Sequence, residues 1–91
     1  MEEISRLRDR IDAVDREIVR LLAERASIAK RLVQVKRRLG MPIVDRRREE
    51  EVLRNVAAQA ESLNVDRRYV ECVYRAIISC TVKLESKSSV E

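Results

Sequence analysis

The chain contains few of the residues that make turns, aromatic cores or metal sites. Its 91 residues include one glycine, one proline and two tyrosines, and no tryptophan, phenylalanine or histidine. So few turn-forming residues exclude a fold of many short strands and predict an all-α protein. Because aromatic rings are nearly absent, aliphatic side chains must fill the core. The lack of histidine and of paired cysteines predicts that there is no metal site.

Cysteine is also scarce, with only Cys72 and Cys80 in the chain. In a helix they would lie about 12 Å apart along the axis. A disulfide needs Cα atoms within about 7 Å, so the two cannot pair within one helix. We expect free thiols in the core of a protein from a reducing compartment. No signal peptide or long apolar run is evident, which predicts a cytoplasmic protein without a membrane partner.

Charged residues make up 40% of the chain, and the net charge is +4. A basic balance of this kind is common in nucleic-acid-binding proteins. Here acids and bases alternate at a spacing of four residues, as in Asp12 and Arg16 or Glu71 and Arg75. That spacing is typical of a solvated helix face. We therefore expect no nucleic-acid partner, and keep a non-enzymatic dimerisation or nucleic-acid-binding module as the alternative from another class.

An apolar seam with helical spacing runs through the first part of the chain and is interrupted by Arg25. Its members recur every three or four residues, the pattern of a helix packed against a partner, and they are Ile4, Leu7, Ile11, Val14, Ile18, Leu21, Ile28, Leu32, Val35 and Leu39. A guanidinium stays charged at ordinary pH and is costly to bury unpaired. An anion must therefore meet Arg25, either a carboxylate side chain or a ligand.

The pattern predicts three helices in a single domain of all 91 residues. The first covers about residues 3–39 and ends before Gly40 and Pro42, which suit a helix terminus. The second covers about residues 46–62, with Asp45 as its N-cap.

Asn64 and Asp66 mark the next break. The third helix covers about residues 67–85, and residues 86–91 are expected to form a flexible tail.

The length of the first helix predicts the oligomeric state. About 36 residues make a rod of roughly 54 Å, whereas a compact chain of this size has a radius of gyration of only about 12 Å. Half of the apolar seam would then lie exposed. A second copy of the chain must cover it, and a two-fold pair is the commonest solution. The prediction is an intertwined helical homodimer.

Several polar residues are spaced so that they can meet. Arg25 and Lys36 are eleven residues apart and share one side of the first helix, so they can close on a small anion. Arg8 is 28 residues from Lys36 and can reach the same place only from a partner chain. Taken singly, Lys36 is typical of a solvated lysine near a helix end and Arg8 of a surface residue.

The second and third helices each add a group. Asp45, Arg48 and Glu49 share one face of the second helix, although alone they read as a capped and charged first turn. Thr81 and Glu85 lie one turn apart near the end of the third helix. A carboxylate there is mildly unfavourable.

In their order and spacing these residues resemble the all-helical class of chorismate mutases. The resemblance spans residues 5 to 85 and is carried by Leu7-Arg8, Ile11 to Asp15, Leu21 to Arg25, Lys36, Pro42-Ile43, Asp45, Arg48-Glu49, Ile77-Ile78, Thr81 and Glu85. It implies a stand-alone enzyme, an intertwined dimer with two shared active sites. It also implies conversion of chorismate to prephenate, the branch step toward phenylalanine and tyrosine.

The resemblance further implies a role for each residue. Arg25, Lys36 and Arg48 of one chain and Arg8 of the other would surround the two carboxylates of chorismate. Thr81 matches a position that is often serine and helps to bind a carboxylate.

Glu49 and the backbone at Asp45 would hold the ring hydroxyl. Lys36 and Glu85 would approach the ether oxygen, which makes them, with Arg25, the catalytic residues. Many relatives have glutamine where this chain has Glu85. Because an ionised carboxylate cannot donate a hydrogen bond, Glu85 must be protonated to assist.

The reaction that the resemblance implies suits this residue chemistry. An intramolecular rearrangement needs no nucleophile, metal or cofactor, and none is expected here. The protein must instead select a reactive conformer and stabilise charge on the breaking C–O bond. The alternative on the same fold is an isochorismate pyruvate-lyase, which would use a similar cationic pocket.

Overall fold

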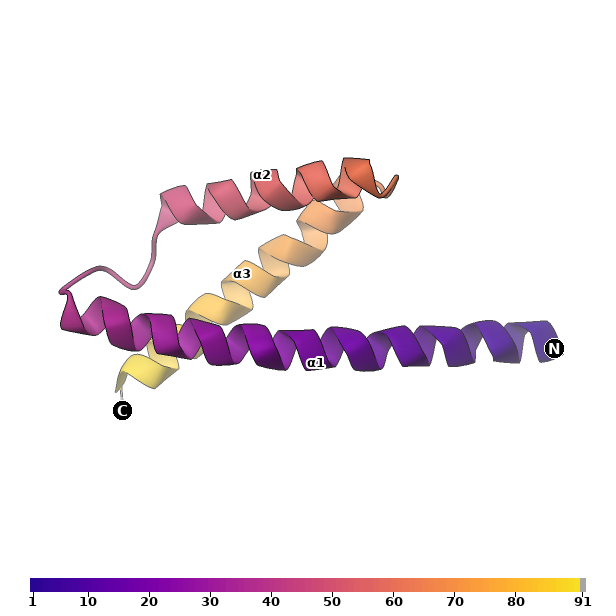
Figure 1. Cartoon of the computed structure of the whole chain (residues 1–91), viewed down its shortest axis with the longest axis horizontal. Coiled ribbons are helices and arrows are strands. Elements are labelled where there is room, and N and C mark those ends of the chain that lie inside the picture. Colours follow the sequence, from indigo (N-terminus) through magenta and orange to yellow (C-terminus); the bar gives the residue numbers. More distant parts are fainter. Residues whose placement is uncertain (91) are drawn as a thin grey trace.

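The computed structural model describes residues 1–90, and the side chains of residues 1–87, as three helices (Figure 1). Helix α1 spans Glu2–Arg38, α2 spans Arg46–Ser62 and α3 spans Arg67–Val90. Helix α3 packs against both of the others, whereas α1 and α2 make no close packing contact within this part of the chain. The predicted all-α fold with a long first helix is confirmed.

The link between α1 and α2 forms for local reasons. Gly40 has a φ of +66°, and its N–H donates to the carbonyl of Arg37 at 3.2 Å. The N–H of Met41 donates to the carbonyl of Lys36 at 2.8 Å. These two bonds are the hydrogen bonds of a Schellman motif. The Asp45 side chain then accepts from the N–H of Arg48 at 3.1 Å, as predicted for an N-cap.

The link between α2 and α3 repeats this design with asparagine in place of glycine. Asn64 has a φ of 59°, and the N–H of Val65 donates to the carbonyl of Ala60 at 2.8 Å. The sequence predicts that the third helix ends at Glu85 and that residues 86–91 form a tail. This prediction is wrong, because α3 continues to Val90. No glycine or proline stops the helix there. Residue 91 lies outside the described residues.

The buried core is small and consists of short side chains. Ala29 and Val33 of α1 and Val56, Ala57 and Ala60 of α2 are the buried apolar residues. Small residues let backbones approach closely, so α3 can lie against both helices. Val33 is only 1% exposed and is the largest fully buried side chain of the described chain.

The two cysteines are free, as predicted, but the predicted core location is wrong for the single chain. Both Cys72 and Cys80 are exposed. They line an apolar groove between α1 and α3 together with Leu22, Ala26, Val73, Ala76, Ile77 and Leu84. A single chain of this size leaves such a groove uncovered because it has too few elements to close it.

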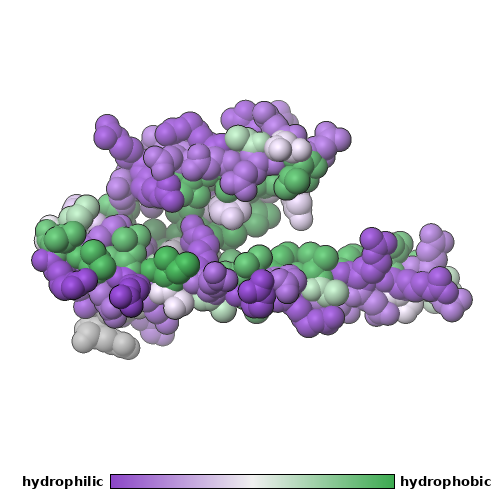
Figure 2. All heavy atoms as spheres, in the orientation of Figure 1, coloured by the Kyte–Doolittle hydropathy of each residue, from purple (hydrophilic) through white to green (hydrophobic). Residues whose placement is uncertain are grey.

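The first half of α1 projects beyond the other two helices (Figure 1). The chain measures 56 Å along its longest axis and has a radius of gyration of 16.4 Å, above the ~12 Å of a compact chain of this length. Figure 2 shows apolar side chains gathered along the edge of α1 nearer α2. The residues of the apolar seam in this half are 48% to 58% exposed, and they are Ile4, Leu7, Ile11, Val14, Ile18 and Leu21.

This extended shape is consistent with an interface along the projecting half of α1, since a continuous row of exposed apolar residues is typical of an interaction site. Across the described residues, none of the helices combines the length and apolar character needed to cross a bilayer.

Replacing Val33 by Ala should lower the free energy of unfolding by about 2 kcal/mol, because two buried methyl groups are lost and a cavity remains. Val19 lies on the same helix but is 65% exposed, so Val19→Ala is the matched control and should change stability by less than about 0.5 kcal/mol. Urea unfolding at equal protein concentration measures both variants. Equal losses in the two would contradict the packing described here.

Candidate active site

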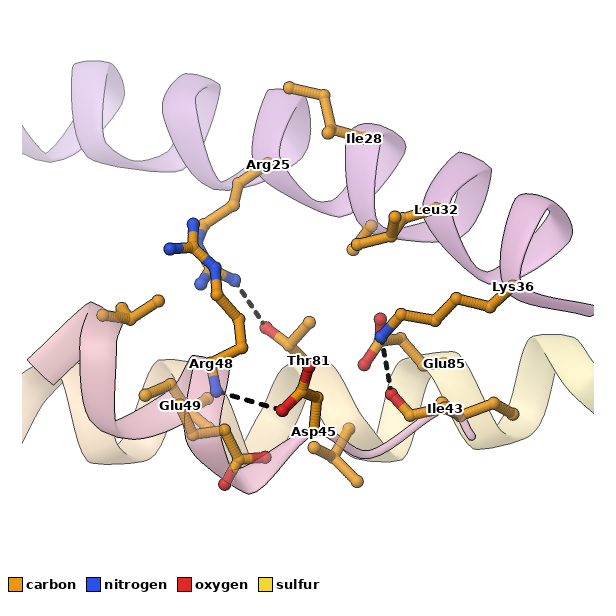
Figure 3. Close-up of a pocket in the computed structure, with 14 residues that line it drawn as sticks. Arg25, Ile28, Leu32, Lys36, Ile43, Asp45, Arg48, Glu49, Thr81 and Glu85 are labelled. Atoms are coloured by element: carbon orange, nitrogen blue, oxygen red, sulfur yellow. Dashed lines mark hydrogen bonds between the residues drawn. The ribbon is translucent and has the colours of Figure 1, made fainter. Parts of the chain in front are cut away.

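A cavity of about 270 Å³ lies between the second half of α1, the start of α2 and the end of α3 (Figure 3). Seven of the eight site residues predicted from the sequence line it: Arg25, Lys36, Asp45, Arg48, Glu49, Thr81 and Glu85. The rest of its wall is apolar and consists of Ile28, Ala29, Leu32, Ile43, Val52, Ile78 and Val82. The size and the mixed lining suit a small anion with an apolar body.

Arg8 is the predicted site residue that the structure does not place in the cavity. It lies on the projecting half of α1 and is exposed, and it is not among the residues that line the cavity. Lys36 lies 28 residues further along the same helix, which is about 42 Å. Within one chain Arg8 therefore cannot reach this cavity.

Arg25 is half-buried and has a neutral partner. Its Nη1 donates to the Thr81 hydroxyl at 2.9 Å, and that hydroxyl oxygen lies 2.6 Å from the carbonyl oxygen of Ile77. No carboxylate of the described chain forms an ion pair with Arg25. The sequence allowed either a carboxylate side chain or a ligand as the anion for Arg25, and no described carboxylate side chain takes that place.

Lys36 is held in a similar way at the other end of the cavity. Its Nζ donates to the backbone carbonyl of Ile43 at 2.9 Å, so the link between α1 and α2 fixes the ammonium group. Figure 3 shows Lys36 and Glu85 pointing toward one another from α1 and α3. Both Lys36 and Arg25 thus make their side-chain hydrogen bonds to uncharged oxygens, which orient a cation without neutralising it.

Arg48 extends from α2, and its side chain and that of Arg25 point toward one another in Figure 3. Arg48 also forms an ion pair with Glu51, one turn further along α2. Glu49 is half-buried, and its carboxylate points away from the two guanidiniums (Figure 3). Two like charges that line one cavity favour an anion between them.

Glu85 is the one buried charged residue among the described side chains, at 7% exposure. Burial raises the pKa of its carboxyl group, the charges of Lys36 and Arg25 lower it, and Glu49 raises it further. The net shift is upward, because loss of solvent disfavours the ionised form more than the two cations favour it. The balance that the sequence predicted, with burial opposing Lys36, is confirmed in direction.

The lining holds three cations and three carboxyl groups, and none of these carboxyl groups forms an ion pair with a lining cation within the described residues. Asp45 accepts the backbone N–H that caps α2, Glu49 points away from the guanidiniums and Glu85 has a raised pKa. The cavity therefore favours an anionic guest. No group of three metal-ligating side chains occurs within the described residues.

Sequence reasoning missed two contacts in this site. The Ile43 carbonyl that holds Lys36 belongs to the backbone, and backbone positions in a link cannot be read from side-chain patterns. Glu51 pairs with Arg48 at a spacing of three residues, which is a recognised helix-pair spacing. That spacing was the available signal for Glu51.

Comparison with known proteins identifies the family. The model described as chorismate mutase type II matches residues 7–86. The chain is 30% identical to a chorismate mutase of Methanocaldococcus jannaschii over 87 residues, 96% of this chain and 88% of that protein.

It is also 37% identical over 93 residues to a bifunctional chorismate mutase/prephenate dehydratase of Aquifex aeolicus, covering 99% of this chain and 26% of that protein. A T-protein of Enterobacter agglomerans is 37% identical over 76 residues, which are 84% of this chain and 20% of that protein. The chain thus spans most of one relative and about a quarter or less of the two others. The family match covers every residue of the cavity and most of the three helices, and this chain belongs to the chorismate mutase type II family.

Proposed function

We propose that this chain catalyses the rearrangement of chorismate to prephenate in the cavity between its three helices. The observation that carries the proposal is the half-buried Arg25, which has no carboxylate partner among the described residues and lines an apolar-walled cavity with Lys36 and Arg48. Chorismate has two carboxylates and an apolar ring, so it supplies the missing negative charge and fills the cavity.

Conformer selection is the first part of the proposed mechanism. Arg25 and Arg48 point toward one another (Figure 3), so a carboxylate between them receives two guanidiniums at once. Lys36 offers a third cation at the other end of the cavity. Fixing both carboxylates brings the two reacting carbon atoms together and removes the entropy cost of reaching that conformation in water.

Electrostatic stabilisation is the second part. Lys36 and Glu85 face each other across one end of the cavity (Figure 3), where they would approach the ether oxygen of the substrate. As the C–O bond breaks, negative charge develops on that oxygen. A fixed ammonium group and a protonated carboxyl group both donate to it without having to reorganise. Glu49 and the backbone at Asp45 would hold the ring hydroxyl.

A second copy of the chain would complete the site. Ile28 and Leu32 line the cavity although they are 62% and 47% exposed, so that wall is open in the single chain. We propose an intertwined homodimer in which the projecting half of the partner's α1 covers this wall. The partner's Arg8 would then reach the cavity and add a fourth cation for the substrate carboxylates.

Replacing Arg25 by Ala should lower kcat/KM for chorismate by about 100-fold or more, because a preorganised charge for the bound anion is lost. The free energy of unfolding should stay equal or rise, since a half-buried charge without an ionic partner is removed. Prephenate formation and urea unfolding measure the two effects.

Arg20 lies on the same helix and forms an exposed pair with Glu17, so Arg20→Ala is the matched control and should retain wild-type turnover. A loss of stability in Arg25→Ala with turnover preserved would contradict the proposal. Isochorismate, assayed beside chorismate, separates the two activities of this fold, because a pyruvate-lyase would release salicylate and pyruvate instead of prephenate.

The activity should fall as the pH rises through the raised pKa of Glu85, since only the protonated carboxyl group can donate to the ether oxygen. Glu85→Gln should flatten this dependence, because an amide donates at every pH. Stability should change in the same direction as activity. The folded state holds the Glu85 proton more tightly than the unfolded chain, so the free energy of unfolding should fall as the pH rises from the unfolded pKa of Glu85 through its raised folded pKa.

The rate of prephenate formation and the free energy of unfolding are measured over one pH series for the wild type and for Glu85→Gln. An identical pH profile in the wild type and Glu85→Gln would rule out the role of the proton.

Mixing Arg8→Ala chains with Arg25→Ala chains should restore activity if sites are shared. Each mixed dimer has one site with both arginines and one with neither, so an equal mixture should reach about a quarter of wild-type activity. Each variant alone should stay low. Subunit exchange followed by an assay tests this, and the absence of any recovery would argue against a shared site.

A further inference from the structure

We propose that Thr81 is a positioning residue that acts through Arg25: its hydroxyl holds the guanidinium in the cavity and does not itself need to touch the substrate. The kinetic test of this inference rests on the proposed function. The structural test depends only on the geometry of the contact. Thr81 comes from α3 and Arg25 from α1 (Figure 3), so the contact joins residues that are 56 positions apart.

The hydrogen-bond directions follow from the groups themselves. A guanidinium donates and cannot accept, so the Thr81 oxygen accepts from Arg25 Nη1 at 2.9 Å. The single hydroxyl proton of Thr81 is then donated to the carbonyl oxygen of Ile77, 2.6 Å away. A threonine inside a helix commonly makes this bond to the preceding turn. The bond leaves the hydroxyl without a proton for a substrate carboxylate.

An uncharged acceptor suits the task of positioning a cation for an anionic guest. A carboxylate at this place would also orient Arg25, but it would neutralise the charge that the substrate needs. The Thr81 oxygen uses one N–H of the guanidinium and leaves the other donors available. Since a long, flexible side chain loses much rotamer freedom when it binds a ligand, fixing Arg25 beforehand lowers the cost of forming the complex.

A direct role for Thr81 has a different consequence. The resemblance noted above implies that this residue helps to bind a carboxylate. To donate to that carboxylate, the hydroxyl would have to release Ile77 and turn toward the substrate. If the Thr81 hydroxyl contacts the substrate directly, its contribution to kcat/KM should persist when Arg25 is absent. If it only positions Arg25, that contribution should disappear together with the guanidinium.

The structural test needs no substrate and uses the ¹⁵N-labelled protein. In Thr81→Val, which keeps the shape of threonine but has no hydroxyl, the Nε–Hε signal of Arg25 should shift and its proton exchange should accelerate several-fold. Thr81→Ser keeps the hydroxyl and should retain the wild-type signal. Arg20, which is exposed and paired within α1, provides an internal control. An unchanged Arg25 signal in Thr81→Val would overturn the proposal.

The kinetic test is a double-mutant cycle. Thr81→Val should lower kcat/KM for chorismate by about 10-fold or more in the wild-type background, the typical effect of losing a hydrogen bond to a charged group, and Thr81→Ser should recover most of it. In the Arg25→Ala background the same change should cost less than about 2-fold. Equal losses in both backgrounds would show a direct substrate contact and overturn the proposal. If no background converts chorismate, the proposed function fails while the NMR result still decides the role of Thr81.

Discussion

A positive charge that the protein's own acids do not neutralise is the constraint on which the site depends. Arg25 interrupts the apolar seam of α1 and donates to the hydroxyl of Thr81 instead of to a carboxylate. Lys36 does the same with a backbone carbonyl. Such cations are costly in a half-buried place, and the cost is recovered only when an anion enters. Among the acids near these cations, Asp45 caps α2, Glu51 forms an exposed pair with Arg48, and the buried Glu85 has a raised pKa.

The same constraint links the fold to the chemistry. Small buried residues such as Ala29 and Val33 let α3 lie close to the second half of α1. Thr81 therefore lies next to Arg25, and Glu85 and Lys36 point toward one another (Figure 3). The first half of α1 projects beyond the other two helices (Figure 1), and among the described residues its apolar seam stays exposed. In the proposed dimer the first half of α1 covers the partner's cavity, while the second half lines the cavity of its own chain. One helix therefore contributes to both active sites.

Local signals predict the three helices and most of their ends, but not every contact of the site. Gly40 and Asp45 act within a few residues of themselves, so the ends that they set were predictable from the sequence. The end of α3 was misjudged because serines at residues 86, 88 and 89 disfavour a helix only weakly. The residues that line the cavity were identified by their resemblance to a family, which rests on the order and spacing of these residues along the chain. The bonds of Thr81 to Arg25 and of Lys36 to Ile43 depend on how elements pack in space, and no spacing rule reports them.

The most direct test of the central claim is the binding of the reaction product, prephenate, measured by calorimetry. A dicarboxylate that supplies the missing charge should bind with one equivalent per chain, and Arg25→Ala should weaken binding by at least about 10-fold, the loss expected for one charge-assisted contact. Failure of the wild type to bind, or equal binding by the variant, would contradict the view that these cations are kept unneutralised for an anionic substrate.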